Sequence, residues 1–370
     1  MRTELLELVM CPHCHASLAV QGEIEDGHVW QGALVCQGCG VRYGVDNGIP
    51  HLYVDDERWA PKAREAQGWI DFHKDKGIYD QTGVDIDFIL PYYDQEPWIS
   101  VAQHFDVALD LMALDGSEKV LDLGAARTWA AKHFALRDCN TVALDIVADD
   151  QIGLGRGWAL MQEAGVEYHL VVGDSENLPL QPDTFDFVFA AAVLHHTSDL
   201  PLLLRNVYRV LKPGGALIAA NEPCIPVATD SEQALERDAA EELAYGINES
   251  RPNLFDYWSA LDGAGFVDLD IFPVQAYRLS DVQLEAWSLE MSVVASPLGR
   301  TPVQRWPHVI AGCLRRWRDL WGKPNPLPPA RSRREALNRA ILLHRGGGIC
   351  LLAHKPIETT PAKLHPDKVG

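Results

Sequence analysis

The strongest constraint on the fold is a regular alternation of short apolar runs with amphipathic segments after residue 118. The apolar runs, which predict strands, lie at 120–123, 141–145, 168–174, 185–193, 216–221, 266–273 and 348–354. Helical patterns at 128–136, 200–211 and 254–263 separate several of these runs. Strands that alternate with helices are typical of a parallel sheet covered on both faces. We therefore expect an α/β fold with a doubly wound, mostly parallel, seven-stranded sheet.

The rest of the chain divides around this sheet, because 370 residues exceed one compact core of usual size. The predicted units are a small β-rich domain at 1–58, a helical linker and cap at 59–117, the sheet domain at 118–275 and 346–358, a basic helical insertion at 276–345 before the last strand, and a tail at 359–370.

Two C-x-x-C pairs mark the first unit, Cys11 with Cys14 and Cys36 with Cys39. A unit of under about 60 residues has too little core to hold itself well. Four thiolates on two tight turns meet the tetrahedral requirement of a structural Zn²⁺ and would supply the missing stability. We therefore predict that these four cysteines bind zinc. The alternative is that His13 or His15 replaces one of them.

The segments CPHC and CQGCGVRYGVDNGIPHL resemble the zinc-ribbon family of the small activator subunit that partners tRNA, rRNA and protein methyltransferases. The resemblance covers about residues 8–54. It implies a zinc-ribbon fold for the first unit.

Two carboxylates stand at the ends of neighbouring predicted strands. Asp122 lies two residues before Gly124, at the turn after the first strand, and Asp145 follows 23 positions later at the tip of the next. A terminal acid there can accept both hydroxyls of a ribose, which implies an adenosine-type ligand. The loop lacks the later glycines of a dinucleotide-binding turn, and an acid at the strand end would repel a phosphate. An acid at this position would instead suit the ammonium or sulfonium group of S-adenosylmethionine.

Four segments in order, VLDLGAARTWAA, VALDI, GDSENLPLQPDTFDFVFAAAVLHH and RVLKPGGALIAANEP, resemble the motifs of class I S-adenosylmethionine-dependent methyltransferases. The resemblance covers about residues 95–275 and resumes at the final strand. It implies a Rossmann-like methyltransferase that uses S-adenosylmethionine. The family usually shows D-x-G-x-G-x-G, whereas this chain has Ala126 and Thr128 at the last two positions. Because threonine is β-branched and resists positive φ, we expect a loop of different shape.

The resemblance also implies which residues bind the cofactor. They are Asp122, Gly124 and Ala126 near the methionine moiety, Asp145 and Ile146 near the ribose, Asp174 and Ser175 at the adenine edge, and Ala190 and Ala191 at the pocket floor. The alternative for Asp145 and Asp174 is that each only caps the next helix.

Three further residues at carboxyl ends of strands are candidates for acceptor binding or catalysis. His195 and His196 follow the fourth strand and Glu222 follows the fifth. A hydroxyl acceptor must lose a proton, and a histidine near its ordinary pKa can accept one. We expect His196 to be the more important histidine; the alternative is that the pair caps the following helix.

Basic and acidic residues are distributed unevenly along the chain, and their distribution helps to predict the kind of molecule that the protein binds. The net charge is −20, yet residues 300–345 carry eleven basic and two acidic side chains. The aromatic helical stripe in this insertion has three interpretations: a helix on the core with a solvated arginine face, a lid that binds a phosphate or carboxylate, or a contact with an anionic membrane. The zinc unit has only Arg2 and Arg42 against six acids through residue 54, which argues against nucleic acid.

We therefore predict an enzyme that moves a methyl group from S-adenosylmethionine to a small-molecule or glycan-like acceptor. The basic insertion would suit an anionic acceptor of this kind. An rRNA or tRNA methyltransferase and an inactive methyltransferase-like, partner-binding subunit are the alternatives. The acidic N-terminus and the lack of a long apolar run lead us to expect a cytoplasmic protein.

Overall fold

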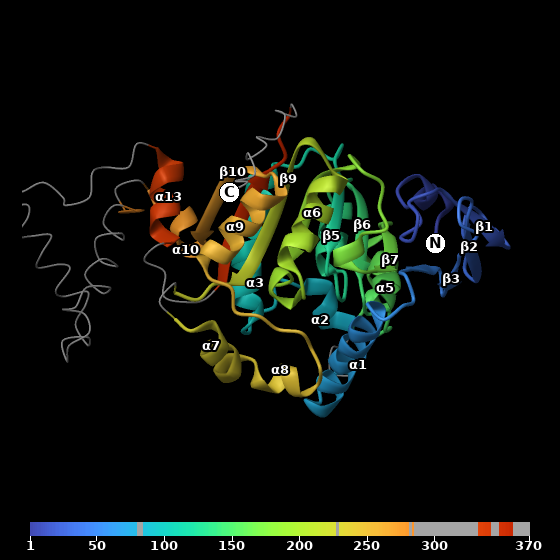
Figure 1. The fold of residues 1–370 in the computed structure, drawn as a ribbon, viewed down its shortest axis with the longest axis horizontal. Helices are drawn as coiled ribbons and strands as arrows, with labels where there is room; N and C mark the ends of the chain where they lie inside the picture. The colour runs from blue at the N-terminus through green and yellow to red at the C-terminus, as the bar shows by residue number, and fades with distance from the viewer. Residues whose placement is uncertain (80–83, 227–228, 281–282, 285–331, 342–347, 358–370) are drawn as a thin grey trace, which may run out of the picture.

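A computed structural model describes residues 1–79, 84–226, 229–280, 283–284, 332–341 and 348–357. The described strands form one mixed sheet of eleven strands in the order β1-β2-β3-β4-β7-β6-β5-β8-β9-β11-β10 (Figure 1). The expectation of seven strands was therefore wrong for the sheet as a whole. Seven strands do come from the predicted sheet domain, and four more come from the N-terminal unit.

The seven strands of the sheet domain reproduce the predicted runs closely. They are β5 (Lys119–Leu123), β6 (Asn140–Asp145), β7 (His169–Gly173), β8 (Phe185–Ala191), β9 (Leu211–Pro223), β10 (Val267–Pro273) and β11 (Gly348–His354). Strands β5 to β9 are parallel, and β11 runs antiparallel to both β9 and β10. Strand β9 starts five residues earlier than the predicted start at Ala216, because Leu211 already pairs with Phe185 before a register shift.

The N-terminal unit is not separate from this sheet. Its strands are β1 (Leu18–Gly22), β2 (Gly32–Cys36), β3 (Arg42–Asp46) and β4 (Ile49–Leu52). The first three pairings are antiparallel, whereas β4 pairs in parallel with β7, with His51 opposite Val172 and Leu52 opposite Gly173. An unpaired edge strand exposes a row of backbone donors and acceptors. Here β4 covers that edge of β7.

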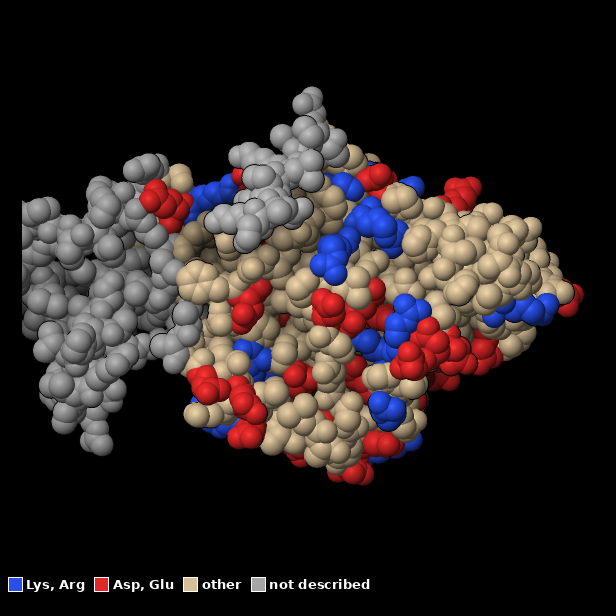
Figure 2. All heavy atoms as spheres, viewed as in Figure 1, with Lys and Arg blue, Asp and Glu red and all other residues tan. Residues whose placement is uncertain are grey.

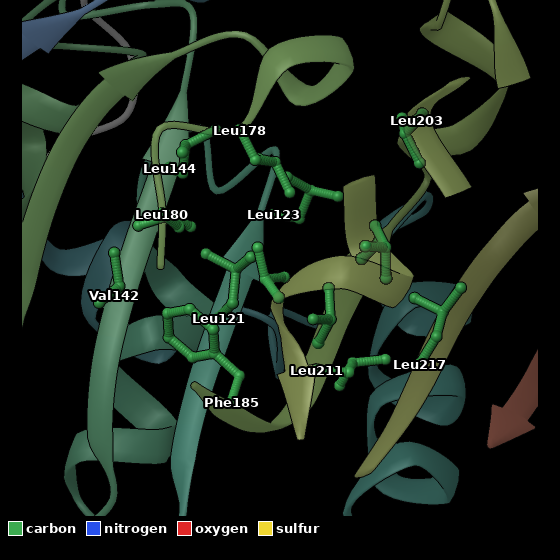
Figure 3. Packing of buried hydrophobic residues seen from close by; sticks show 14 of the residues in the cluster. Leu121, Leu123, Val142, Leu144, Leu178, Leu180, Phe185, Leu203, Leu211 and Leu217 are labelled. Atoms are coloured by element: carbon green, nitrogen blue, oxygen red, sulfur yellow. The ribbon is translucent and has the colours of Figure 1, made fainter. Parts of the chain in front are cut away.

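Helices cover both faces of the sheet. On one face, α6 (Leu200–Val210) and α9 (Leu254–Ala264) belong to a hydrophobic cluster that includes Leu121 and Leu123 of β5, and Figure 3 shows these two leucines with Leu203 of α6. On the other face, α3 (Trp98–Met112) and α4 (Trp129–Ala135) pack on Val120 and Phe189. Successive side chains of a strand point to opposite faces. Asp122 therefore lies on the same face as Val120, toward α4.

The remaining described helices lie around this framework. They are α1 (Trp59–Asp75), α2 (Val84–Ile89), α5 (Gly157–Ala164), α7 (Ser231–Asp238), α8 (Ala240–Ala244), α10 (Val274–Tyr277) and α13 (Arg333–Ile341), with short 3-10 turns η1 (Thr3–Glu7), η2 (Leu154–Arg156), η3 (Ser175–Asn177) and η4 (Leu194–His196). None of the described helices is long and apolar enough to span a bilayer.

Most of the basic insertion and the tail lie outside the described residues, including the predicted tryptophan-rich helix. Side-chain contacts are described for three of its arginines, and the first, Arg278, lies 3.5 Å from Asp106. Arg333 donates to the carbonyl of Leu279, and Arg334 pairs with Asp268 at 2.8 Å. These two therefore bind neighbouring parts of the chain.

Candidate functional site

The four cysteines of the N-terminal unit converge on one point. Cys11 Sγ and Cys39 Sγ are 3.7 Å apart, and Cys14 Sγ and Cys36 Sγ are 3.3 Å apart. All four sulfurs lie within 4.8 Å of one another. The backbone N–H groups of Gly38 and Cys39 point at Cys36 Sγ, as expected for a knuckle turn that holds a thiolate.

This arrangement fits zinc. Zn–S bonds of about 2.3 Å in a tetrahedron place the sulfurs about 3.8 Å apart. The Cys11–Cys39 separation of 3.7 Å matches this value, and the Cys14–Cys36 separation of 3.3 Å is somewhat shorter. Among the described residues, no histidine joins this group, so the alternative with His13 or His15 is not supported. The four sulfurs would hold the ion and would fix the two knuckles relative to each other.

A cavity of about 430 Å³ opens at the carboxyl ends of β5, β6, β7 and β8. The chain passes from β5 to β6 on one side and later to β8 on the other, so this is the point where an open α/β sheet forms a ligand crevice. The predicted residues that line the cavity are Asp122, Gly124, Ala126, Asp145, Ile146, Ser175, Ala191 and His196.

The loop after β5 keeps a left-handed backbone at every second residue, although two of the three positions are not glycine. Gly124, Ala126 and Thr128 have φ values of 67°, 43° and 63°. The expectation that Thr128 would change the loop shape was therefore wrong. Thr128 Oγ1 lies 2.8 Å from the Tyr168 hydroxyl, a buried hydrogen bond that holds the residue in this conformation. A Cβ at Gly124 would lie 2.5 Å from Val193 Cγ2, so glycine is required there.

Replacing Ala126 by glycine should raise the free energy of unfolding by about 1 kcal/mol, because a left-handed backbone strains alanine but not glycine. Urea denaturation measures the change. Ala135→Gly, in the right-handed helix α4, is the matched control and should lower stability by a similar amount. Destabilisation by both variants would contradict the left-handed loop.

The carboxylate of Asp145 organises this loop. Its Oδ2 accepts the backbone N–H of Ala126 at 2.8 Å, and its Oδ1 accepts that of Val147 at 2.8 Å. Burial raises the pKa of Asp145, and these two backbone donors oppose the shift. A carboxylate oxygen can accept more than one hydrogen bond. Asp145 therefore supports the loop and still faces the cavity.

Asp122 is an acid of the cavity wall that is almost completely buried. Only 3% of the residue is exposed, and its Oδ2 accepts the N–H of Ala131 in α4 at 2.9 Å. Burial raises its pKa to about 8. No cationic partner contacts this carboxyl among the described residues, so a bound cation would stabilise its charged form.

Four predicted residues do not line the cavity. Asp174 caps η3 by accepting the N–H of Glu176, which is the alternative role considered for it, and Ala190 is fully buried in β8. His195 and Glu222 lie behind the cavity wall. Glu222 is buried and accepts the N–H groups of Val193 and Leu194 at 2.7 and 2.9 Å.

The two histidines form the short turn η4 and do not cap the next helix, since Asp199 caps α6. His196 lines the cavity, and its ring meets Trp69 edge-on with centroids 5.4 Å apart. Burial lowers the pKa of His196 to about 4, so its imidazole is neutral at pH 7. His195 Nδ1 lies 2.9 Å from Glu222 Oε2.

Sequence reasoning missed the contribution of α1, which was expected only as part of a helical cap. Lys62, Glu65, Trp69 and His73 all line the cavity from this helix. Burial raises the pKa of Glu65 to about 7. The spacing of 62, 65, 69 and 73 is helical, but a stripe of charged and aromatic residues at this spacing is equally typical of a solvated face.

Comparison with known proteins agrees with both parts of the chain. Residues 121–219 match the methyltransferase domain family, and residues 2–48 match the family of Trm112p-like proteins. The chain thus joins an N-terminal Trm112p-like domain to a methyltransferase domain, which confirms the resemblance predicted from the sequence.

Several curated proteins are similar over the methyltransferase domain. They include the biotin biosynthesis bifunctional protein BioHC of Cellvibrio japonicus (33% identity, 26% of this chain and 18% of that protein), the sterol 24-C-methyltransferase erg6 of Schizosaccharomyces pombe (30%, 31% and 31%) and the malonyl-acyl-carrier-protein O-methyltransferase of Serratia marcescens (29%, 30% and 43%). The chain spans less than half the length of each of these relatives.

Solved structures with a related arrangement include phosphoethanolamine N-methyltransferase 2 of Haemonchus contortus with S-adenosyl-L-methionine (17% identity, TM-score 0.45, 77% of this chain and 59% of that chain). A complex of the Trm112 methyltransferase activator of Haloferax volcanii with a methyltransferase also matches (17%, TM-score 0.41, 79% and 98%).

Proposed function

We propose that this protein transfers a methyl group from S-adenosylmethionine to a small-molecule or glycan-like acceptor. The observation that carries the proposal is the cavity at the strand ends, where Asp122, Asp145 and the left-handed loop come together. Its volume lies in the range of small-molecule sites. The sulfonium methyl group would supply the chemistry, and methyl transfer is a one-step displacement that depends mainly on alignment and exclusion of water.

The cavity residues divide the work of binding. Asp145 would accept the ribose hydroxyls, and Asp122 would offer negative charge to the cationic end of the cofactor. Ile146 and Ala191 would pack on apolar parts, and Ser175 would meet the adenine edge. These roles are supported by the position of each side chain on the cavity wall.

His196 would bind the methyl acceptor through a hydrogen bond. It is the member of the pair that lines the cavity, and a neutral imidazole can accept a hydrogen bond from an acceptor hydroxyl. Glu222 and His195 would act as positioning residues, because Glu222 holds both the backbone of η4 and the His195 ring from behind the wall.

Three observations favour a small acceptor over RNA. Two of the matched relatives are named for their acceptors, a malonyl-acyl-carrier protein and a sterol. The Trm112p-like domain carries few basic residues. On the face shown in Figure 2, Lys and Arg form small separate groups among acids and no continuous band. A polyanion needs a basic surface. Whether the acceptor is anionic stays a prediction, because most basic residues of the insertion lie outside the described residues.

The proposal predicts that S-adenosylhomocysteine binds the purified, zinc-loaded protein. Calorimetric titration should also show at least tenfold weaker binding by Asp145→Asn, since a hydrogen bond to a charged group contributes about 1.5–3 kcal/mol. Asp262→Asn, on the exposed side of α9, is the matched control and should bind like the wild type. No binding at millimolar cofactor would instead support the inactive, partner-binding alternative. Salt-sensitive retention on RNA would support the nucleic-acid alternative.

A further inference from the structure

A second group of potential metal ligands lies next to the cavity. One imidazole nitrogen each from His195 and His196 and a carboxylate oxygen of Glu249 lie within 4.8 Å of one another. The side chains of His195 and Glu249 are only 9% and 5% exposed. Two imidazoles and one carboxylate form a donor set that suits divalent transition metals such as Zn²⁺, Fe²⁺ and Co²⁺.

The hydrogen bonds around His195 leave one ring nitrogen free to act as a ligand. Its Nδ1 faces Glu222 Oε2 at 2.9 Å, and because a carboxylate only accepts, Nδ1 must donate. In the neutral ring, Nε2 then carries the lone pair. A carboxylate that orients a metal-binding histidine in this way is a common outer-shell arrangement.

Nε2 of His195 faces Glu249 Oε2 at 3.9 Å. This oxygen also pairs with Arg251. A lone pair and a carboxylate both accept hydrogen bonds, so a cation between His195 Nε2 and Glu249 would stabilise both groups. His196 Nδ1 lies 2.7 Å from the carbonyl of Asn248 and 3.5 Å from Glu249 Oε1, so this nitrogen is the donor. The lone pair of His196 is then on Nε2, and this is the nitrogen that would have to bind the ion.

The charged groups around the two histidines also favour a bound cation. The buried carboxylates of Glu222 and Glu249 meet one described arginine, Arg251, which pairs with Glu249. Two carboxylates and one described guanidinium make this a site where a bound cation would add a favourable partner for the acids.

We propose that His195, His196 and Glu249 bind a divalent transition metal ion, with Glu222 orienting His195 from the outer shell. Because His196 also lines the cavity, the ion would lie beside the acceptor. The acceptor oxygen would then bind the ion instead of the His196 lone pair, which favours an acceptor with a metal-binding oxygen, such as an enolate, a carboxylate or paired hydroxyls. The metal site stands on its own geometry, whereas this choice of acceptor rests on the proposed methyltransferase function.

Titration of zinc-loaded protein with Co²⁺, followed by visible absorption and calorimetry, tests the site. We expect one additional Co²⁺ per chain with a visible absorption band from imidazole and carboxylate ligation. Glu249→Gln should abolish this binding, and Glu222→Gln should weaken it about 10- to 100-fold, as loss of an outer-shell partner does. Arg251→Gln should strengthen it, because the guanidinium competes for Glu249.

The opposite effects of Glu249→Gln and Arg251→Gln separate a metal site from an ion-pair network, in which both variants would only lower stability. Glu241→Gln, an exposed acid on α8, is the matched control and should leave Co²⁺ binding unchanged. Failure to bind Co²⁺ at millimolar concentration, or equal binding by Glu249→Gln, would overturn the proposal in favour of the ion-pair network. S-adenosylhomocysteine titration of the same samples shows separately whether the cofactor site works.

Discussion

Asp122→Asn should stabilise the empty protein while it weakens S-adenosylmethionine binding at least tenfold. Burial raises the pKa of Asp122 to about 8, so the folded state holds this proton more tightly than the unfolded chain does. Its ionisation therefore removes stability as the pH rises from about 4 to about 8. Asparagine does not ionise, so the variant does not lose this stability. The difference in free energy of unfolding between Asp122→Asn and the wild type should therefore grow over this pH range and reach at least about 1 kcal/mol at pH 8.

The same substitution should weaken S-adenosylmethionine binding because it removes a negative charge that the cofactor needs. A cationic ligand stabilises the charged carboxylate, and asparagine offers it no charge. Urea denaturation across pH and calorimetry with S-adenosylmethionine measure the two effects, with Asp262→Asn as an exposed control that should change neither. If Asp122→Asn bound the cofactor as tightly as the wild type, Asp122 would be a structural residue only.

Removal of zinc should unfold the Trm112p-like domain and also weaken cofactor binding in the methyltransferase domain. Structural zinc contributes about 10–16 kcal/mol in small zinc-binding peptides, so this domain should not fold without it. Its loss would uncover the edge of β7. It would also remove contacts to the segment after β7, such as the bonds from Met10 N to the Pro179 carbonyl at 2.9 Å and from Asn177 Nδ2 to the Pro12 carbonyl at 3.1 Å.

Cys36→Ser tests this coupling, because it removes one ligand. Metal analysis should show one zinc fewer per chain, and calorimetry should show weaker S-adenosylhomocysteine binding, since Ser175 lies between β7 and the contacted segment. Cys139→Ser, a buried cysteine outside the cluster, should retain zinc. Normal cofactor binding by zinc-free Cys36→Ser would show that the two domains are independent.

Much of the fold could be predicted because its strands are apolar and sharply bounded. The run at 348–354 coincides with β11, and 141–145 differs from β6 by one residue. The pairing of β4 with β7 could not be predicted. Two strands from different domains pair through backbone N–H and C=O groups at a sheet edge, and this pairing requires no particular side chains in the sequence. Helix α5 was missed for a different reason, since Gly157–Ala164 is short and begins with a poor helix former.

The site was predictable where the residue type and the strand end together fix the role. Asp122 and Asp145 line the cavity as expected. Asp174 has the same residue type at an equivalent strand end but caps η3, and sequence alone does not separate these two uses of aspartate. Glu65 and Trp69 reach the cavity from α1 through tertiary packing, which no local pattern encodes. Thr128 was misjudged because its partner, Tyr168, lies forty residues away.

A crystal structure with S-adenosylhomocysteine would show whether the cavity binds the cofactor. We expect the molecule in the cavity at the ends of β5, β6 and β8, with its ribose hydroxyls within hydrogen-bond distance of Asp145 and its sulfur on the side of His196. A ligand bound elsewhere, or a ribose turned away from Asp145, would contradict this expectation.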